Sequence, residues 1–198
     1  KLLAPKAAAV AVAFEGSTLP HAELTGAPVR QSIVTLDRDA ARAAARAALG
    51  LPDDRFVVAV MCGSQGAAAV NAVVTQALER LADRDDLAVY HVVGERFVDG
   101  AAPARDGTQG ILYRVIGYEE RMLQLYAAAD LMVTRGGAGT IAELATVAAA
   151  VAVELREQRV VAERLVGTAG AARDLARTRH HRRYRPGRRP GAARPGQA

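Results

Sequence analysis

The chain contains no tryptophan, and only 4% of its 198 residues are aromatic. A single cysteine, Cys62, rules out an internal disulfide framework and favours the reducing cytoplasm. No stretch approaches the ~18 consecutive apolar residues that a membrane-spanning helix needs. The apolar residues, 51% of the chain, are mostly alanine and valine. Such small side chains suit one α/β domain with closely packed layers, and the length suffices for its core.

Common motifs of nucleotide and metal chemistry are also missing. No lysine follows the glycines at 63–66 or 136–139, so neither segment is a P-loop, and neither has the G-x-G-x-x-G spacing of a dinucleotide site. His21 and His91 are far from each other and from any cysteine, which leaves no zinc-ligand spacing. The Asp-x-Asp at 37–39 begins a helix and is explained by capping. We therefore expect no metal and no cofactor.

The net charge of +5 originates near the C-terminus. Residues 151–198 hold 12 arginines against 4 acidic residues, whereas residues 1–150 are slightly acidic. From residue 174 the Arg-, Pro- and Gly-rich sequence has no apolar periodicity, so we predict a disordered tail over 174–198. A nucleic-acid partner is disfavoured, because the tail offers few aromatic side chains for stacking on bases.

Short β-rich segments alternate with longer alanine-rich stretches, as in βαβ units around a parallel sheet. We predict strands at 8–14, 56–61, 87–93, 111–116 and 131–134, and helices at 37–49, 67–82, 119–129 and 140–147. Asp37 is suited to cap the first helix, and Gly50 to end it. Residues 21–30 are predicted to be a crossover that contains a turn. The fold class is therefore α/β, with a Rossmann-like parallel sheet and flanking helices.

Two glycine-rich junctions between a strand and a helix, at 61–67 and 134–140, carry the strongest local signal. Glycines let a backbone approach a ligand closely, and the first N–H groups of a helix are unpaired donors at the positive end of its dipole. In an open parallel sheet both junctions would lie at the carboxyl edge, where ligands bind. The pattern favours a phosphate or diphosphate, although two tight turns that bind nothing have the same sequence pattern.

Five motifs extend this picture over much of the chain. They stand at 25–30 (TGAPVR), 63–71 (GSQGAAAVN), 118–122 (YEERM), 126–131 (YAAADL) and 135–143 (RGGAGTIAE). In order and spacing they resemble the peptidoglycan UDP-N-acetylglucosamine:N-acetylmuramoyl-pentapeptide pyrophosphoryl-undecaprenol N-acetylglucosaminyltransferase family. That family has two facing Rossmann-like domains, the GT-B arrangement. The resemblance implies that residues 25–173 are its C-terminal, UDP-sugar-binding domain, and that residues 1–24 are the end of the N-terminal domain and a linker.

The resemblance also implies roles for individual residues. Glu143 would accept hydrogen bonds from the ribose hydroxyls, Tyr118 and Glu119 would belong to a uracil slot formed mainly by backbone groups, and Arg30 would lie near the donor. The diphosphate would contact both helix starts, at Ser64, Gln65, Gly66, Ala138, Gly139 and Thr140. An exposed helix glutamate at 143, a core-edge tyrosine at 118 or a surface arginine at 30 would have the same sequence.

Other residues of these motifs have a structural interpretation. Met122 and Tyr126 occur at helical spacing and are predicted to be core residues. Asn71 is predicted to fix its helix without contacting the substrate.

The C-terminal part departs from the family. Gln158 is the candidate for recognising the sugar hydroxyls, since residues 157–165 resemble the family's D-H-Q-x-x-N-A helix, but Val161 stands at the Asn position. The alanines at 148–150 replace a Gly-x-Pro turn, and the following loop is short. We hypothesise a frame disruption or a degenerate copy.

The function that the resemblance implies is inverting transfer of N-acetylglucosamine from UDP-N-acetylglucosamine to lipid-linked N-acetylmuramoyl-pentapeptide. The enzyme would be a hexosyltransferase that works at the cytoplasmic face of the plasma membrane as a peripheral protein. The catalytic base and the undecaprenyl-linked acceptor would belong to the other domain, so no catalytic residue is named and this fragment is expected to be inactive alone. The alternatives are a UDP-sugar-binding domain of another lipid glycosyltransferase or of a UDP-sugar epimerase, and a non-catalytic donor-binding subunit.

Overall fold

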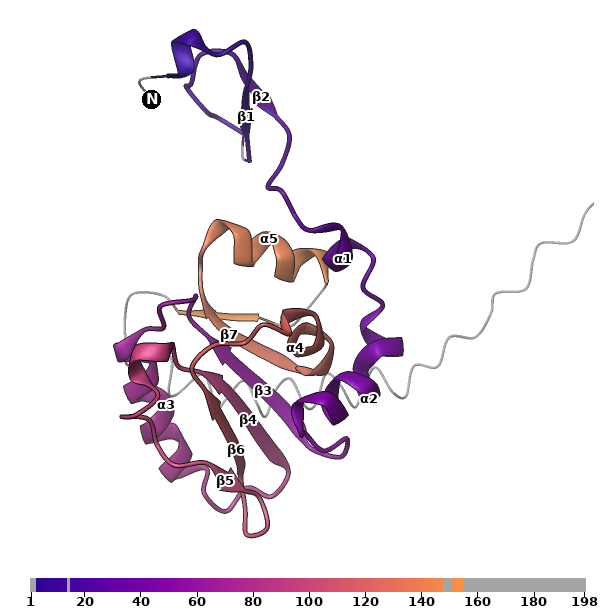
Figure 1. Ribbon diagram of the computed structural model, residues 1–198, viewed down its shortest axis with the longest axis vertical. Coiled ribbons are helices and arrows are strands. Elements are labelled where there is room, and N and C mark those ends of the chain that lie inside the picture. The colour runs from indigo at the N-terminus through magenta and orange to yellow at the C-terminus, as the bar shows by residue number, and fades with distance from the viewer. Residues whose placement is uncertain (1–2, 14, 148–150, 155–198) are drawn as a thin grey trace, which may run out of the picture.

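The computed structural model describes residues 3–13, 15–147 and 151–154. Six of the described strands form one sheet in the order β5-β6-β4-β3-β7-β8 (Figure 1). Its strands are β3 (Phe56–Met61), β4 (Leu87–Val92), β5 (Arg105–Asp106), β6 (Leu112–Ile116), β7 (Leu131–Arg135) and β8 (Val151–Glu154). β5 runs antiparallel to β6, and the other pairings in this sheet are parallel. This order is that of a Rossmann-like α/β sheet, as predicted.

The helices cover both faces of the sheet (Figure 1). They are α1 (Gln31–Val34), α2 (Arg38–Leu49), α3 (Ala68–Arg80), α4 (Met122–Ala128) and α5 (Ala138–Thr146), with short 3₁₀ turns η1 (Ala4–Lys6) and η2 (Glu95–Phe97). Side chains of β3 alternate between the faces. Val57 and Ala59 pack in the cluster with α2 and α4, whereas Val58 and Val60 pack in the cluster with α3.

The predicted helix at 37–49 forms for the expected local reasons. Asp37 is the N-cap, and its Oδ1 accepts a hydrogen bond of 3.0 Å from the amide of Ala40. Gly50 ends the helix in the left-handed conformation with φ +66°, where a side chain would be disfavoured. Both helix boundaries are therefore confirmed.

A buried ion pair holds α2 against the sheet. The Arg46 side chain is fully buried, and its Nη2 donates to Asp130 Oδ2 at 2.6 Å. Its remaining N–H groups donate to the backbone carbonyls of Pro52, Asp53, Arg55 and Ala128. Burial lowers the Arg46 pKa, although Asp130 opposes that shift. The network joins α2 to the start of β3 and β7.

The structure differs from the prediction at several element ends. The helix expected from residue 119 begins at Met122, because the Glu119 carboxylate holds the Arg121 amide in a turn at 2.7 Å. The helix expected at 140–147 begins two residues earlier, at Ala138. The short elements α1 and β5 were not predicted, since neither is long enough to show a periodicity.

The N-terminal part forms a separate two-stranded sheet. β1 (Val10–Val12) lies inside the predicted strand 8–14, and β2 (Ala22–Leu24) is an additional strand within the predicted crossover 21–30. The two pair in parallel, with Val10 opposite Ala22. Figure 1 shows this pair apart from the six-stranded sheet, at the end of an extended segment. The domain limits at 24, 173 and 198 stay a prediction, and the segment 174–198 lies outside the described residues.

Candidate functional site

The two glycine-rich junctions lie side by side at the carboxyl edge of the sheet. β3 and β7 are parallel neighbours, and Met61 is paired with Thr134 at their ends. Each strand therefore delivers its glycine turn to the same edge, as predicted. A cavity of about 180 Å³, here called the edge cavity, opens between them. It is lined by Met61, Gly63, Ser64, Val92, Tyr118, Glu119, Met122, Tyr126, Thr140 and Glu143.

The first junction is a tight turn in which two glycines are required. Gly63 and Gly66 have φ values of +77° and +65°, and the Gly66 amide donates to the Gly63 carbonyl at 3.0 Å. A Cβ atom on Gly66 would stand 1.9 Å from the carbonyl oxygen of Val93, so only glycine fits there. Ser64 lines the edge cavity, whereas Gln65 and Gly66 belong to the turn without lining it.

The second junction presents an open helix start. Gly137 is the N-cap of α5, and no side chain of the described residues caps this helix. A Cβ atom on Gly139 would meet nothing within 4 Å. Ala138 and Gly139 are exposed, and Thr140 lines the edge cavity. The first N–H groups of α5 can therefore donate to an anion at this edge.

Glu143 faces the edge cavity and is held by two side chains from distant segments. Its Oε2 accepts a hydrogen bond of 2.5 Å from the Tyr126 hydroxyl, and its Oε1 pairs with Arg30 Nη2 at 3.4 Å. Its side chain is 21% exposed, so both oxygens can also accept hydrogen bonds from a ligand. Burial and the hydrogen bond to Glu143 raise the Tyr126 pKa, so this tyrosine stays protonated and donates.

Tyr118 and Glu119 both line the edge cavity but differ in exposure. Tyr118 is 53% exposed, and its ring is available to a planar ligand. Glu119 is 5% exposed, and its carboxylate accepts hydrogen bonds from the Tyr90 hydroxyl and from Arg121. Burial would raise the Glu119 pKa, but these hydrogen bonds outweigh it and the pKa is lowered. The side chain of Glu119 thus shapes the loop before α4.

Two residues predicted to be core also form the cavity wall. Tyr126 is 1% exposed and packs in the core, as expected, but its hydroxyl reaches Glu143. Met122, which is partly buried, lines the cavity one turn earlier on α4. Helical spacing indicated only the core role. A clue was the polar hydroxyl on a buried aromatic residue, because such a group needs a partner.

Arg135, at the end of β7, adds a cation between the junctions. Its side chain is exposed, and its Nη2 lies 3.8 Å from the position that a Cβ atom would take on Gly63. Arg135 is not among the site residues predicted from the sequence. Its position after the last buried residue of a central strand was the available signal.

Asn71 fixes its helix as predicted. Its Nδ2 donates to the carbonyl of Val93 at 3.0 Å, which ties α3 to the end of β4. Gln158, the sugar-binding candidate, lies outside the described residues. Among the residues that the structure describes, no group of three or more His, Cys, Asp and Glu side chains is placed to hold a metal ion.

Known proteins resemble this chain in both sequence and fold. The transferase named UDP-N-acetylglucosamine–N-acetylmuramyl-(pentapeptide) pyrophosphoryl-undecaprenol N-acetylglucosamine transferase of Clavibacter sepedonicus is 43% identical over 150 residues, covering 74% of this chain and 38% of that protein. The protein of the same name from Paenarthrobacter aurescens is 41% identical over 171 residues, covering 82% of this chain and 44% of the relative. The chain thus spans about two fifths of the length of these relatives.

A crystal structure of Acinetobacter baumannii MurG matches with a TM-score of 0.50 and 23% identity, covering 90% of this chain and 53% of that one. At this identity the match supports the α/β fold alone. The model of the glycosyltransferase family 28 C-terminal domain matches residues 57–172, more than half of the chain and both glycine-rich junctions. The chain therefore belongs to the family defined by the glycosyltransferase family 28 C-terminal domain.

Proposed function

We propose that the edge cavity binds UDP-N-acetylglucosamine, and that the chain is the donor-binding half of an N-acetylglucosaminyltransferase of peptidoglycan synthesis. The observation that carries the proposal is the convergence of both glycine-rich junctions and Glu143 on one cavity. The relatives support the choice of donor, since their name specifies transfer of N-acetylglucosamine to an undecaprenol-linked muramyl-pentapeptide.

The ribose would be bound by Glu143. A carboxylate oxygen has two lone pairs, so each oxygen can keep its protein partner and still accept a ribose hydroxyl. Tyr126, which is buried and protonated, fixes the orientation of the carboxylate through its hydroxyl. Arg30 pairs with the same carboxylate and is 58% exposed, so it is free to turn toward the phosphates when the donor binds.

The diphosphate would lie between the starts of α3 and α5. Each helix start carries roughly half a positive charge, and neither N-cap, Ala67 nor Gly137, supplies a side-chain acceptor that would compete for the N–H groups. Ser64 and Thr140, one from each junction, line the edge cavity and add hydroxyl donors. Arg135 adds a full positive charge, which stabilises the negative charge that develops on UDP as it leaves.

The uracil would stack on Tyr118 and bond to backbone groups of residues 116–119. Ring stacking suits Tyr118, because it lines the cavity and is exposed. Gln158 remains the candidate for the sugar hydroxyls.

In the whole enzyme, the acceptor hydroxyl would attack C1 of the sugar with inversion while UDP departs. The lipid-linked muramyl-pentapeptide acceptor, the catalytic base and a peripheral contact with the cytoplasmic membrane face would belong to the rest of that enzyme. Within residues 3–13, 15–147 and 151–154, no helix is both long and apolar enough to cross a membrane.

Calorimetry with UDP, UDP-N-acetylglucosamine and UDP-glucose tests the proposal. We expect Glu143→Gln to weaken UDP binding by about 10-fold or more, because a hydrogen bond to a charged group contributes about 1.5–3 kcal/mol. Glu79→Gln is the matched control, since Glu79 is an exposed helix glutamate far from the edge cavity and pairs with Arg105. Equal UDP affinities for Glu143→Gln and the unmodified chain would rule out the proposed ribose contact of Glu143. Preference for another UDP-sugar would favour a different transferase or an epimerase.

A further inference from the structure

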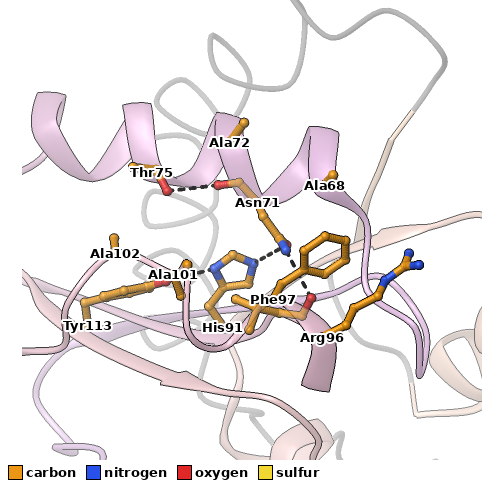
Figure 2. A pocket seen from close by; sticks show the side chains of 12 residues that line it. Ala68, Asn71, Ala72, Thr75, His91, Arg96, Phe97, Ala101, Ala102 and Tyr113 are labelled. Atoms are coloured by element: carbon orange, nitrogen blue, oxygen red, sulfur yellow. Dashed lines mark hydrogen bonds between the residues drawn. The ribbon is translucent and has the colours of Figure 1, made fainter.

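A second cavity, of about 300 Å³, lies on the α3 side of the sheet, whereas the edge cavity lies on the α4 side. Figure 2 shows Asn71 and Thr75 of α3 above it, with His91 of β4 and Tyr113 of β6 on its floor. His91 and Tyr113 are 2% and 1% exposed. Two buried polar side chains on the floor of an α/β sheet require an explanation, because burying them without partners is costly.

These side chains form one directed chain of hydrogen bonds (Figure 2). Because Asn71 Nδ2 donates to the Val93 carbonyl, its Oδ1 is the acceptor that faces His91 Nε2 at 3.1 Å. His91 therefore carries its proton on Nε2, and its Nδ1 accepts from the Tyr113 hydroxyl at 3.0 Å. Every donor points the same way, from Tyr113 toward the carbonyl of Val93.

The Val93 carbonyl is in turn pressed against the first glycine-rich junction. A Cβ atom on Gly66 would stand 1.9 Å from that carbonyl oxygen, and one on Gly94 would stand 2.7 Å from the carbonyl oxygen of Gln65. Both glycines have positive φ. The two backbones are interlocked without intervening side chains, so a shift of Val93 must move Gln65 and Gly66.

We propose that Asn71, held in place by His91 and Tyr113, is a positioning residue that sets the glycine turn 63–66 for the donor diphosphate. The inference rests on the proposed function for its ligand, but not for its effect on the turn. Asn71 lies on the α3 side of the sheet, and its side chain reaches the turn through the carbonyl of Val93.

Hydrogen exchange at single amides tests the effect on the turn. The Gly66 amide donates to Gly63 within the turn, and the Ile141 amide donates to Gly137 in the second junction. In Asn71→Ala we expect Gly66 to exchange about two- to twelvefold faster, as after losing one hydrogen bond, and Ile141 to be unchanged. Unchanged Gly66 exchange, or an equal rise at Ile141, overturns the proposal.

Binding separates positioning from a general loss of structure. Asn71→Ala should weaken UDP by the same two- to twelvefold while leaving uridine, which has no phosphate, within about twofold. Equal losses for both ligands overturn the positioning role. If the unmodified chain binds neither ligand, the proposed function fails, and the exchange of Gly66 still decides whether Asn71 holds the turn.

Two further variants complete the test. Thr75→Val is the control, because Thr75 lies on the same helix and lines the same cavity but donates only to the carbonyl of Asn71 within α3. It should leave Gly66 exchange and UDP affinity unchanged. If Asn71→Ala does not fold, Tyr113→Phe removes the far end of the chain of hydrogen bonds, and a smaller change in the same direction is expected. No change at Gly66 in a folded Tyr113→Phe would then overturn the proposal.

Discussion

Replacing Tyr126 with phenylalanine removes one hydroxyl from the wall of the edge cavity. That hydroxyl donates to Glu143 Oε2 at 2.5 Å, and the tyrosine is 1% exposed. The ring remains to fill the core, so the fold should persist. Among the described side chains, Glu143 would keep its long contact of 3.4 Å to Arg30, whose side chain is 58% exposed. The carboxylate would therefore lose its fixed orientation while staying charged and accessible.

The expected loss of affinity follows from ordering that carboxylate again. Immobilising a flexible side chain on binding costs about 0.5–1.5 kcal/mol, which corresponds to UDP binding weakened about 2- to 12-fold. Isothermal titration with UDP at 25 °C measures it. The control is a double-mutant cycle with Glu143→Gln, in which Tyr126→Phe should have little further effect, because the partner that it positions has lost its charge. Unchanged affinity in Tyr126→Phe, or an equal loss in both backgrounds, would refute the reasoning.

Three other predictions address charge, packing and pH. Arg135→Gln should weaken UDP binding by about 10-fold and leave uridine binding unaffected, because charged hydrogen bonds to phosphate contribute about 1.5–3 kcal/mol. Calorimetry measures both affinities, and equal losses for the two ligands would place Arg135 away from the phosphates. Asp130→Ala should lower the free energy of unfolding by about 3–5 kcal/mol, since it leaves the buried Arg46 without its carboxylate partner. Urea unfolding measures this loss, with Asp99→Ala at an exposed position as the control, and a loss under about 1 kcal/mol would contradict the prediction. Burial lowers the His91 pKa from 6.5 to about 4. The unfolded state therefore takes up a proton that the folded state resists, so about 3 kcal/mol of stability is present above pH 6.5 and is lost as the pH falls toward about 4. The free energy of unfolding, measured with urea, should fall more between pH 7 and pH 5 for the unmodified chain than for His91→Gln.

The Glu119 carboxylate shows why a motif match alone does not assign a side chain. The family resemblance places Glu119 in the uracil slot, and the structure puts it on the cavity wall. However, its two carboxylate oxygens already accept hydrogen bonds from Tyr90 and Arg121, so they are occupied within the protein. This partly buried network joins β4 to the loop before α4, and nothing in the local sequence shows that these two segments meet. The backbone near Glu119, and not its carboxylate, is what remains for a ligand.

Local physics determined the elements from the sequence alone. The strand Phe56–Met61 was predicted at both ends, because a short apolar run between polar turns has few alternatives. The helix after Asp37 was likewise predicted, since its cap and its glycine stop lie within the segment itself. The two glycine-rich junctions could be placed at one edge of the sheet, because parallel strands bring their carboxyl ends together.

Only the tertiary structure decided which side chains meet. Arg30 and Glu143 are 113 residues apart, and Tyr126 joins them from a third segment. Likewise, Asn71 is linked to Val93 and His91 across about 20 positions. Sequence periodicity reports on neighbours one or two turns away, whereas these contacts depend on the strand order and on which face of the sheet each helix covers. For that reason the sequence indicated where a phosphate could bind, and the fold determined which residues hold the binding groups in place.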